Sequence, residues 1–250
     1  MPKGHSGIKR SSKLISSQTQ ISAKTAVSIP IAKTIAEANQ IAVDLGLTIY
    51  ADFTGLDLSV ANEMIQELAE TKEIIPNFGS LQAYGGHAAV QTHIDGKFYK
   101  ADAAGLCYGG EAISLNHFRY SSSEIQQTIK KEKLLEEIGF HPVGTGSVRG
   151  VISHEIGHAI DFRVKAYQDP SIQALFKRYS DGTMSTETIP IYVGKTVPTK
   201  MIQALSAYAN FDIQEFIAEA WTEYRNNPSP RPVAKQVGDR RLELAKGMIS

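Results

Sequence analysis

The chain has 250 residues, of which 42 % are apolar and 21 % are charged, and its formal net charge is zero. This length suffices for one sizeable globular domain or two small ones, and one domain is the simpler interpretation. The single cysteine, Cys107, excludes an internal disulfide framework and a cysteine-based zinc cluster. No run of eighteen apolar residues is present, so we expect no membrane span.

The basic residues are unevenly distributed. Residues 1–36 hold six Lys and Arg and no Asp or Glu, which leaves a net charge of −6 on the remainder. A basic arm can touch an anionic surface, but its Ser, Lys and Gly content is more typical of a solvated tail, and we expect residues 1–28 to be disordered. No nucleic-acid-binding motif accompanies it, so we expect no nucleic-acid partner. The first thirty residues also lack the continuous apolar core of a secretory signal peptide.

The first half of the chain alternates between helical and strand-like periods of hydrophobicity. Asp95-Gly96 has the composition of a two-residue hairpin turn between two of several short strand-like runs. Ser123 and Gln126 have the spacing of a helix cap. Together these patterns predict helices over 31–43, 56–75 and 123–138, and strands over 47–53, 90–94, 97–101 and 111–116.

The second half is mostly helical in its patterns. A glycine-rich segment leads into an apolar helical pattern over 147–161, and later helices are separated by turn-rich stretches. We expect helices over 171–180, 199–209 and 212–224, turns and short extended pieces over 182–198, and one short surface helix in the last eighteen residues.

The helix over 147–161 contains the pentapeptide His154-Glu155-Ile156-Gly157-His158, an H-E-x-x-H motif. The two histidines lie one helical turn apart, about 40° around the axis and about 6 Å along it, so both imidazoles can reach one metal ion. Glu155 projects about 100° from His154, where a general base can act on metal-bound water. The alternative is a pair of core histidines with a solvated glutamate. Gly157 argues against it, because an interior glycine destabilises a helix and implies a close approach.

A catalytic zinc needs a third protein ligand, and the helix over 212–224 offers Glu215 and Glu219 on one face. The alternatives are that Glu215 closes a capping box with Asp212 or that both glutamates face water. The H-E-x-x-H motif favours the ligand interpretation, with Glu215 preferred. Tyr208 is a candidate oxyanion donor or an ordinary half-buried tyrosine. His141 lies in a loop thirteen residues before the motif and is disfavoured as a ligand.

Three segments resemble a known group of proteins. The catalytic domain of anthrax toxin lethal factor and the related Pro-Pro endopeptidases, which are gluzincin-type zinc peptidases, are similar to this chain over residues 147–225. The resemblance implies that His154, His158 and Glu215 bind one Zn²⁺, Glu155 is the general base, Tyr208 stabilises the oxyanion and Glu219 supports a ligand histidine. It rests on His154-Glu155-Ile156-Gly157-His158-Ala159-Ile160-Asp161, on Tyr208, and on Glu215-Phe216-Ile217-Ala218-Glu219-Ala220.

The expected fold is therefore α+β and zincin-like, with a small twisted mixed sheet over the H-E-x-x-H helix and a mostly helical C-terminal part. Residues 29–250 would form a single domain. The expected function is hydrolysis of peptide bonds in a peptide or protein substrate by a zinc-dependent endopeptidase, in which Glu155 activates zinc-bound water. The substrate would add as a strand beside residues 111–116, at Ile113, Ser114 and Leu115.

A second hypothesis comes from a different class of function. Similar domains occur in phage head-morphogenesis and other mobile-element proteins, so a phage or prophage origin is consistent with the resemblance. The alternative function is that of a structural or assembly protein whose zincin domain is weakly active or inactive. The cytoplasm or a phage particle is the expected location.

Overall fold

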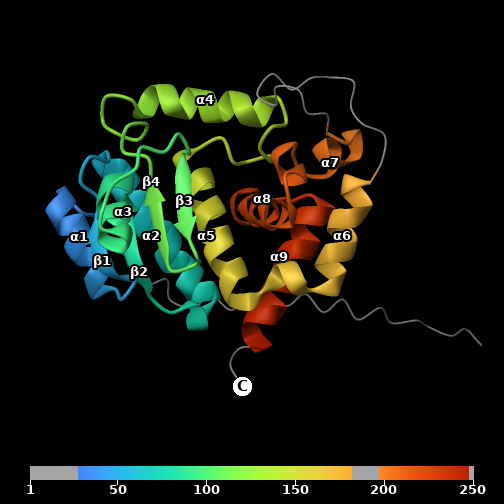
Figure 1. Ribbon diagram of the computed structural model, residues 1–250, viewed down its shortest axis with the longest axis horizontal. Helices are drawn as coiled ribbons and strands as arrows, with labels where there is room; N and C mark the ends of the chain where they lie inside the picture. The colour runs from blue at the N-terminus through green and yellow to red at the C-terminus, as the bar shows by residue number, and fades with distance from the viewer. Residues whose placement is uncertain (1–27, 182–196, 248–250) are drawn as a thin grey trace, which may run out of the picture.

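The computed structural model describes residues 28–181 and 197–247. Within these residues the chain forms an α+β fold, with a small mixed sheet at one end and a mostly helical part at the other (Figure 1). The α+β class and the small mixed sheet are thereby confirmed. Nearly all of the predicted disordered tail, and the turns predicted over 182–198 except for their last two residues, lie outside the described residues.

The sheet has four strands in the spatial order β1-β2-β4-β3. β1, β2 and β4 run parallel, whereas β3 runs antiparallel to β4 and ends the sheet beside helix α5. Predicted strands over 47–53 and 111–116 are confirmed as β1 and β4. The strand bounds are β1 Thr48–Asp52, β2 Leu81–Gly86, β3 Gly105–Tyr108 and β4 Ala112–Leu115.

Helices cover both faces of the sheet. On one face, Val90 of α3 forms a buried cluster with Ala83 and Ala112. On the other face, Tyr84 and Ile113 belong to the main core together with side chains of α1, α2 and α5. These helices span Ile35–Asp44 (α1), Leu58–Ile74 (α2), His87–Asp95 (α3) and Val148–Val164 (α5).

The hairpin predicted at Asp95-Gly96 is wrong, because residues 87–95 form helix α3. Gly96 has a φ of 72° and donates its N–H to Thr92, which is how a glycine ends a helix. A glycine with a positive φ is equally favourable at the end of a helix and in a tight hairpin turn, so this glycine alone does not distinguish the two. The buried contacts of Val90 decide between the two.

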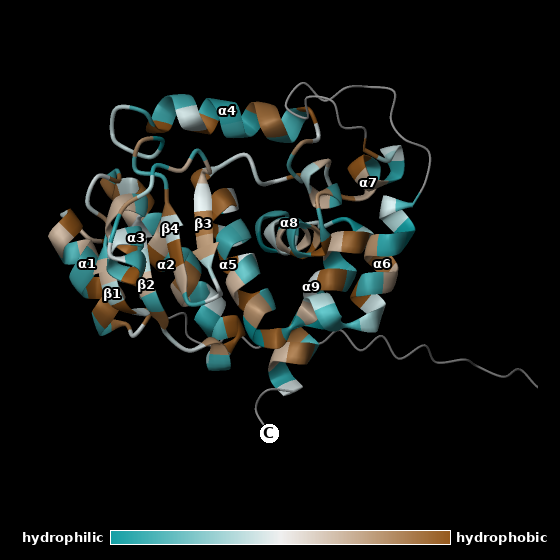
Figure 2. Ribbon diagram, viewed as in Figure 1, coloured by the Kyte–Doolittle hydropathy of each residue, from teal (hydrophilic) through white to brown (hydrophobic). Residues whose placement is uncertain are grey.

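The remaining helices form the helical second half of the molecule, and α4 lies across the top of the view in Figure 1. There it crosses above both halves, and Figure 2 shows hydrophobic and hydrophilic residues alternating along it. Its predicted Ser-x-x-Gln cap is wrong, since α4 begins after Glu124, whose side chain makes no capping bond. These helices span Ile125–Glu137 (α4), Pro170–Ser180 (α6), Thr199–Ala204 (α7), Ile213–Asn226 (α8) and Pro232–Gly247 (α9).

The C-terminal helix is longer and more buried than the sequence suggested. α9 covers 16 residues, and Val233, Ala234 and Val237 enter the second core cluster. Arg241 is fully buried, donates to the carbonyl of Gly157 and lies 4.9 Å from the Trp221 ring. These contacts attach α9 to both α5 and α8, so it is not a surface helix.

α5 and α8 pack closely at the centre of the molecule. A Cβ atom at Gly157 would lie 3.1 Å from Cα of Ala218, so glycine allows the two backbones to approach. A buried ion cluster also joins these helices to α2, because Glu67 is fully buried and accepts from Arg225 of α8 and Ser153 of α5. In the described residues no helix is both long and apolar enough to cross a membrane.

Substitution Gly157→Ala tests this close approach. We expect the free energy of unfolding to fall by about 1–3 kcal/mol, because the added methyl group forces α5 and α8 apart. Urea denaturation followed by circular dichroism measures the change. Gly247→Ala is the control, since a Cβ there meets no atom within 4 Å. An equal loss in both variants would contradict the packing explanation.

Candidate metal centre

Local capping holds the two helices that carry the site. Ser147 accepts a hydrogen bond from Gly150 N–H and starts α5, which presents His154, Glu155 and His158. Gly150 must remain small, because a Cβ there would lie 2.0 Å from the carbonyl oxygen of Thr145. These contacts set where α5 begins, and therefore which way the H-E-x-x-H side chains project.

The start of α8 is capped by Asp212, whose carboxylate accepts from the N–H groups of Gln214 and Glu215. The side chain of Glu215 does not return to close a capping box. It turns instead toward the histidines of α5, with Oε2 at 3.1 Å from His154 Nε2 and 3.4 Å from His158 Nε2. Both alternatives for Glu215, a capping box and a solvated side chain, are therefore wrong.

The three side chains His154, His158 and Glu215 form a group that can hold a metal ion. The three candidate ligand atoms, Nε2 of His154, Nε2 of His158 and Oε2 of Glu215, form a triangle. Its sides are 3.1 Å between the two nitrogens, and 3.1 and 3.4 Å from these nitrogens to the oxygen. Ligands about 2.05 Å from a tetrahedral ion lie about 3.3 Å from one another, so the triangle fits. Oε2 of Glu215 is buried without a hydrogen-bond partner among the described residues. A cation would satisfy it.

Glu219, one turn after Glu215, supports the site without joining the triangle. It is 1 % exposed, and its Oε1 lies 2.9 Å from His154 Nδ1 while its Oε2 accepts from Ser206 at 2.7 Å. Burial opposes ionisation, but His141 and His154 outweigh it and lower the pKa of Glu219 to about 2. An ionised Glu219 holds the proton of His154 on Nδ1, which leaves Nε2 free to bind an ion.

Glu155 projects toward β3 and not into the ligand triangle. It is 7 % exposed, and burial raises the pKa of its carboxyl group above the usual value. A Cβ atom at Gly105 would lie 2.6 Å from Oε1 of Glu155, so this strand position admits the carboxylate only because it is glycine. Glu155 is thus a desolvated carboxyl group beside the ligands, as proton transfer near neutral pH requires.

Tyr208 lies on the short helical turn Tyr208–Asn210, and its ring centroid is 5.9 Å from that of His154. Its hydroxyl donates to Glu215 Oε1 at 3.3 Å, a long hydrogen bond. Burial and the neighbouring glutamates raise the pKa of Tyr208, so the phenol stays protonated and can donate. The structure therefore brings together all six residues singled out around the motif: His154, Glu155, His158, Tyr208, Glu215 and Glu219.

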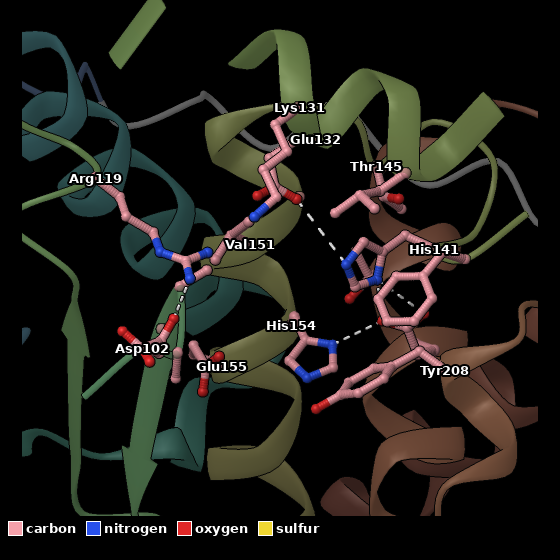
Figure 3. A pocket seen from close by; sticks show the side chains of 18 residues that line it. Asp102, Arg119, Lys131, Glu132, His141, Thr145, Val151, His154, Glu155 and Tyr208 are labelled. Atoms are coloured by element: carbon pink, nitrogen blue, oxygen red, sulfur yellow. Dashed lines mark hydrogen bonds and ion pairs between the residues drawn. The ribbon is translucent and has the colours of Figure 1, made fainter. Parts of the chain in front are cut away.

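Four of these side chains, those of His154, Glu155, Tyr208 and Glu219, line a cavity of about 400 Å³ under α4 (Figure 3). Gly105 and Phe140 also line it, and Figure 3 shows Val151 of α5 on one side and His141 and Tyr208 on the other. Figure 3 shows His154 and Glu155 between these two sides. The cavity reaches the surface beside Arg119 and Lys131, which also line the adjoining surface hollow.

The substrate-binding prediction at Ile113, Ser114 and Leu115 is wrong. These residues lie in β4, which is paired on both sides, and all three are fully buried. β3 is the strand at the open edge, and Asn116 N–H bonds Ala104 C=O in the ladder between them. Backbone groups alternate in direction along an antiparallel ladder, so those of Gly105 and Cys107 face away from β4.

Some residues of the cavity were missed by sequence reasoning. His141, which the sequence disfavoured as a ligand, lies outside the His154, His158 and Glu215 group, and its Nδ1 is 3.4 Å from both carboxylate oxygens of Glu219. Ser206, Glu132 and Gly105 carried no local signal, because each reaches the site only through the fold. Only the short distance of Ser206 from Tyr208 in the chain could have drawn attention to it.

Comparison with protein-family models, with curated proteins and with solved structures finds no match to this chain. The residues themselves define what the site can do. Two imidazoles and a carboxylate can hold a divalent cation, while a buried carboxyl group and a phenol border the same cavity. This combination suits hydrolysis assisted by a metal ion.

The paired substitutions Glu215→Ala and Glu219→Ala test which glutamate binds the ion. We expect Glu215→Ala to nearly abolish tight binding of Zn²⁺, because it removes one of three ligands. Glu219→Ala should weaken binding about 10–100-fold, since it removes only the support of His154. Competition with a chromogenic chelator measures the affinity, and Glu137→Ala on the exposed side of α4 is the control. The reverse order would show that the two roles are exchanged.

Proposed function

We propose that this chain is a zinc-dependent endopeptidase with a zincin-like fold of the gluzincin type. The observation that carries this proposal is the convergence of His154, His158 and Glu215 at tetrahedral spacing beside the buried carboxyl group of Glu155. The resemblance to lethal factor and the Pro-Pro endopeptidases supports the same assignment. One Zn²⁺ per chain is proposed because residues 28–181 and 197–247 contain one such three-ligand group.

The fit of the residues to zinc is chemical as well as geometric. Imidazole nitrogens and one carboxylate oxygen are ligands that zinc prefers, and three of them leave a position for a reactant. When bound, zinc acts as a Lewis acid that polarises the scissile carbonyl group and acidifies water. Glu219 and Ser206 keep His154 in the tautomer and orientation that such an ion needs.

Glu155 is the general base in this proposal. Its carboxylate accepts a proton from the attacking water, the oxygen of which forms the new bond to the carbonyl carbon, and the same proton passes to the leaving amine as the C–N bond breaks. Its raised pKa suits both acceptance and release. Tyr208 must turn from Glu215 to donate its hydroxyl proton in a hydrogen bond to the oxyanion.

The open edge of β3 is the proposed place for an extended substrate. Gly105 lies against Glu155 and lines the cavity, so a peptide paired with this edge would pass the metal ligands. The N–H and C=O groups of Gly105 and Cys107 face the open edge and can continue the sheet. This edge replaces β4 as the proposed substrate strand.

Glu155→Gln tests the assignment of the base. The amide keeps the shape of the side chain but cannot accept the proton, so we expect peptide cleavage to fall by at least about 100-fold. Zinc content should remain one ion per chain, measured by metal analysis after zinc-supplemented purification. Cleavage is measured on a mixed peptide library. An equal loss of zinc would make Glu155 structural.

Wild-type protein that binds zinc and cleaves no peptide would overturn the endopeptidase proposal. The assembly-protein alternative would then be the better explanation. Protein that binds no zinc after careful supplementation would overturn the metal site itself.

Cys107→Pro tests the substrate strand. Proline removes an N–H group that faces the open edge and leaves the ladder to β4 intact, so KM should rise about twofold to tenfold, the value of one hydrogen bond. Cys107→Ala is the matched control, because it removes the thiol and keeps the N–H group. A normal KM in folded Cys107→Pro protein would exclude this edge from the site.

A further inference from the structure

The cavity beside the metal centre has an uneven distribution of charge. Three buried glutamates, Glu132, Glu155 and Glu219, line it and are 3 %, 7 % and 1 % exposed, beside the imidazoles of His141 and His154. The cations that line it are placed differently, since Lys131 is exposed and Arg119 is half-buried with its guanidinium donating to the carbonyl oxygen of Asp102. The interior is therefore acidic and the rim is basic.

Glu132 is the one buried carboxylate of this cavity that the proposed reaction does not use. It projects from α4 toward His141 and forms a long ion pair with the imidazole when that ring is protonated (Figure 3). Oε2 and Nε2 are 3.9 Å apart, which is too far for a hydrogen bond. No hydrogen bond reaches its carboxylate from any described residue. Burial raises the pKa of Glu132, and the cations near it do not compensate.

The other two buried carboxylates, Glu219 and Glu155, already have contacts or a proposed role. Glu219 contacts His154, His141 and Ser206, and Glu155 faces the strand where the substrate would lie. Glu132 is buried, and its one charged neighbour, His141, is too far away to give it a hydrogen bond. A cation that donates a hydrogen bond would stabilise its carboxylate. Glu132 therefore calls for a positively charged ligand group.

The walls around Glu132 are apolar. Leu135, Phe140 and Val151 line the same cavity, so a ligand there would contact hydrocarbon as well as the carboxylate. The volume of about 400 Å³ has room for a long side chain. A flexible aliphatic stem with a cation at its tip matches this combination of apolar walls and a carboxylate, and lysine and arginine are the amino acids that have such a side chain.

We propose that Glu132 makes this cavity a specificity pocket for a basic side chain, lysine or arginine, of the substrate residue next to the scissile bond. This inference rests on the proposed endopeptidase function. An acidic side chain would meet three buried carboxylates, so the cavity discriminates against it. A neutral side chain of equal length would contact the apolar walls but would leave the carboxylate of Glu132 without a hydrogen bond.

The first test compares cleavage of three peptide sets that are identical except for lysine, norleucine or glutamate at each position flanking the cleaved bond. Wild-type protein should prefer lysine to norleucine by about tenfold to a hundredfold in kcat/KM, because a charged hydrogen bond is gained. Glu132→Gln should lose most of this preference, because its kcat/KM should fall much more for the lysine peptide than for the norleucine peptide. Glu137→Gln, a change of the same kind at an exposed position of α4, should keep it.

The second test does not depend on activity. Binding of N-acetyl-lysine methylamide and N-acetyl-norleucine methylamide is compared by saturation-transfer NMR with wild-type protein and with Glu132→Gln, and thermal unfolding checks that the variant is folded. Glu132-dependent binding of the lysine probe supports the pocket even if no peptide is cleaved, in which case the endopeptidase proposal alone fails. Peptide cleavage without a lysine preference, or equal binding of both probes, overturns the pocket. An unfolded Glu132→Gln is replaced by Glu132→Asp, which should reduce the preference at least threefold.

Discussion

The close contact between α5 and α8 is the constraint on which the site depends. Gly157 lets the backbone of α5 approach Ala218, and Arg241 from α9 donates to the carbonyl group of that same glycine. This contact sits between His154 and His158 in the sequence and places Glu215 and Glu219 against them. A side chain at position 157 would separate the two helices that share the metal ligands.

Four buried or half-buried glutamates serve the cavity in four different ways, and their neighbours explain the difference. Glu215 faces two imidazole nitrogens, whereas Glu219 is saturated by a histidine and a serine hydroxyl. Glu155 is buried against Gly105 of β3. Glu132 extends from α4 into the cavity and makes no hydrogen bond among the described residues. In the proposed function, these chemically identical side chains would serve as ligand, support, base and specificity residue because their surroundings differ.

Elements with strong periodicity were predictable. Helices α2, α5 and α8, and strands β1 and β4, lie within a few residues of their predicted bounds because apolar spacing follows the side that is buried. The failures occurred where one local signal serves two structures. Gly96 ends α3 and does not turn a hairpin. The short surface helix predicted at the C-terminus is instead a longer helix whose Val233, Val237 and Arg241 are buried.

The sequence by itself determined the helical spacing of His154 and His158 and the two glutamates offered to them, since one helix turn fixes these relations locally. Only the tertiary structure decided that Glu215 joins the histidines and that Glu219 lies behind His154. It also decided that β3 and not β4 is the open edge, because strand order depends on pairing between distant segments. Ser206, Gly105 and Glu132 meet the site from three separate elements, and no spacing along the chain records such a meeting.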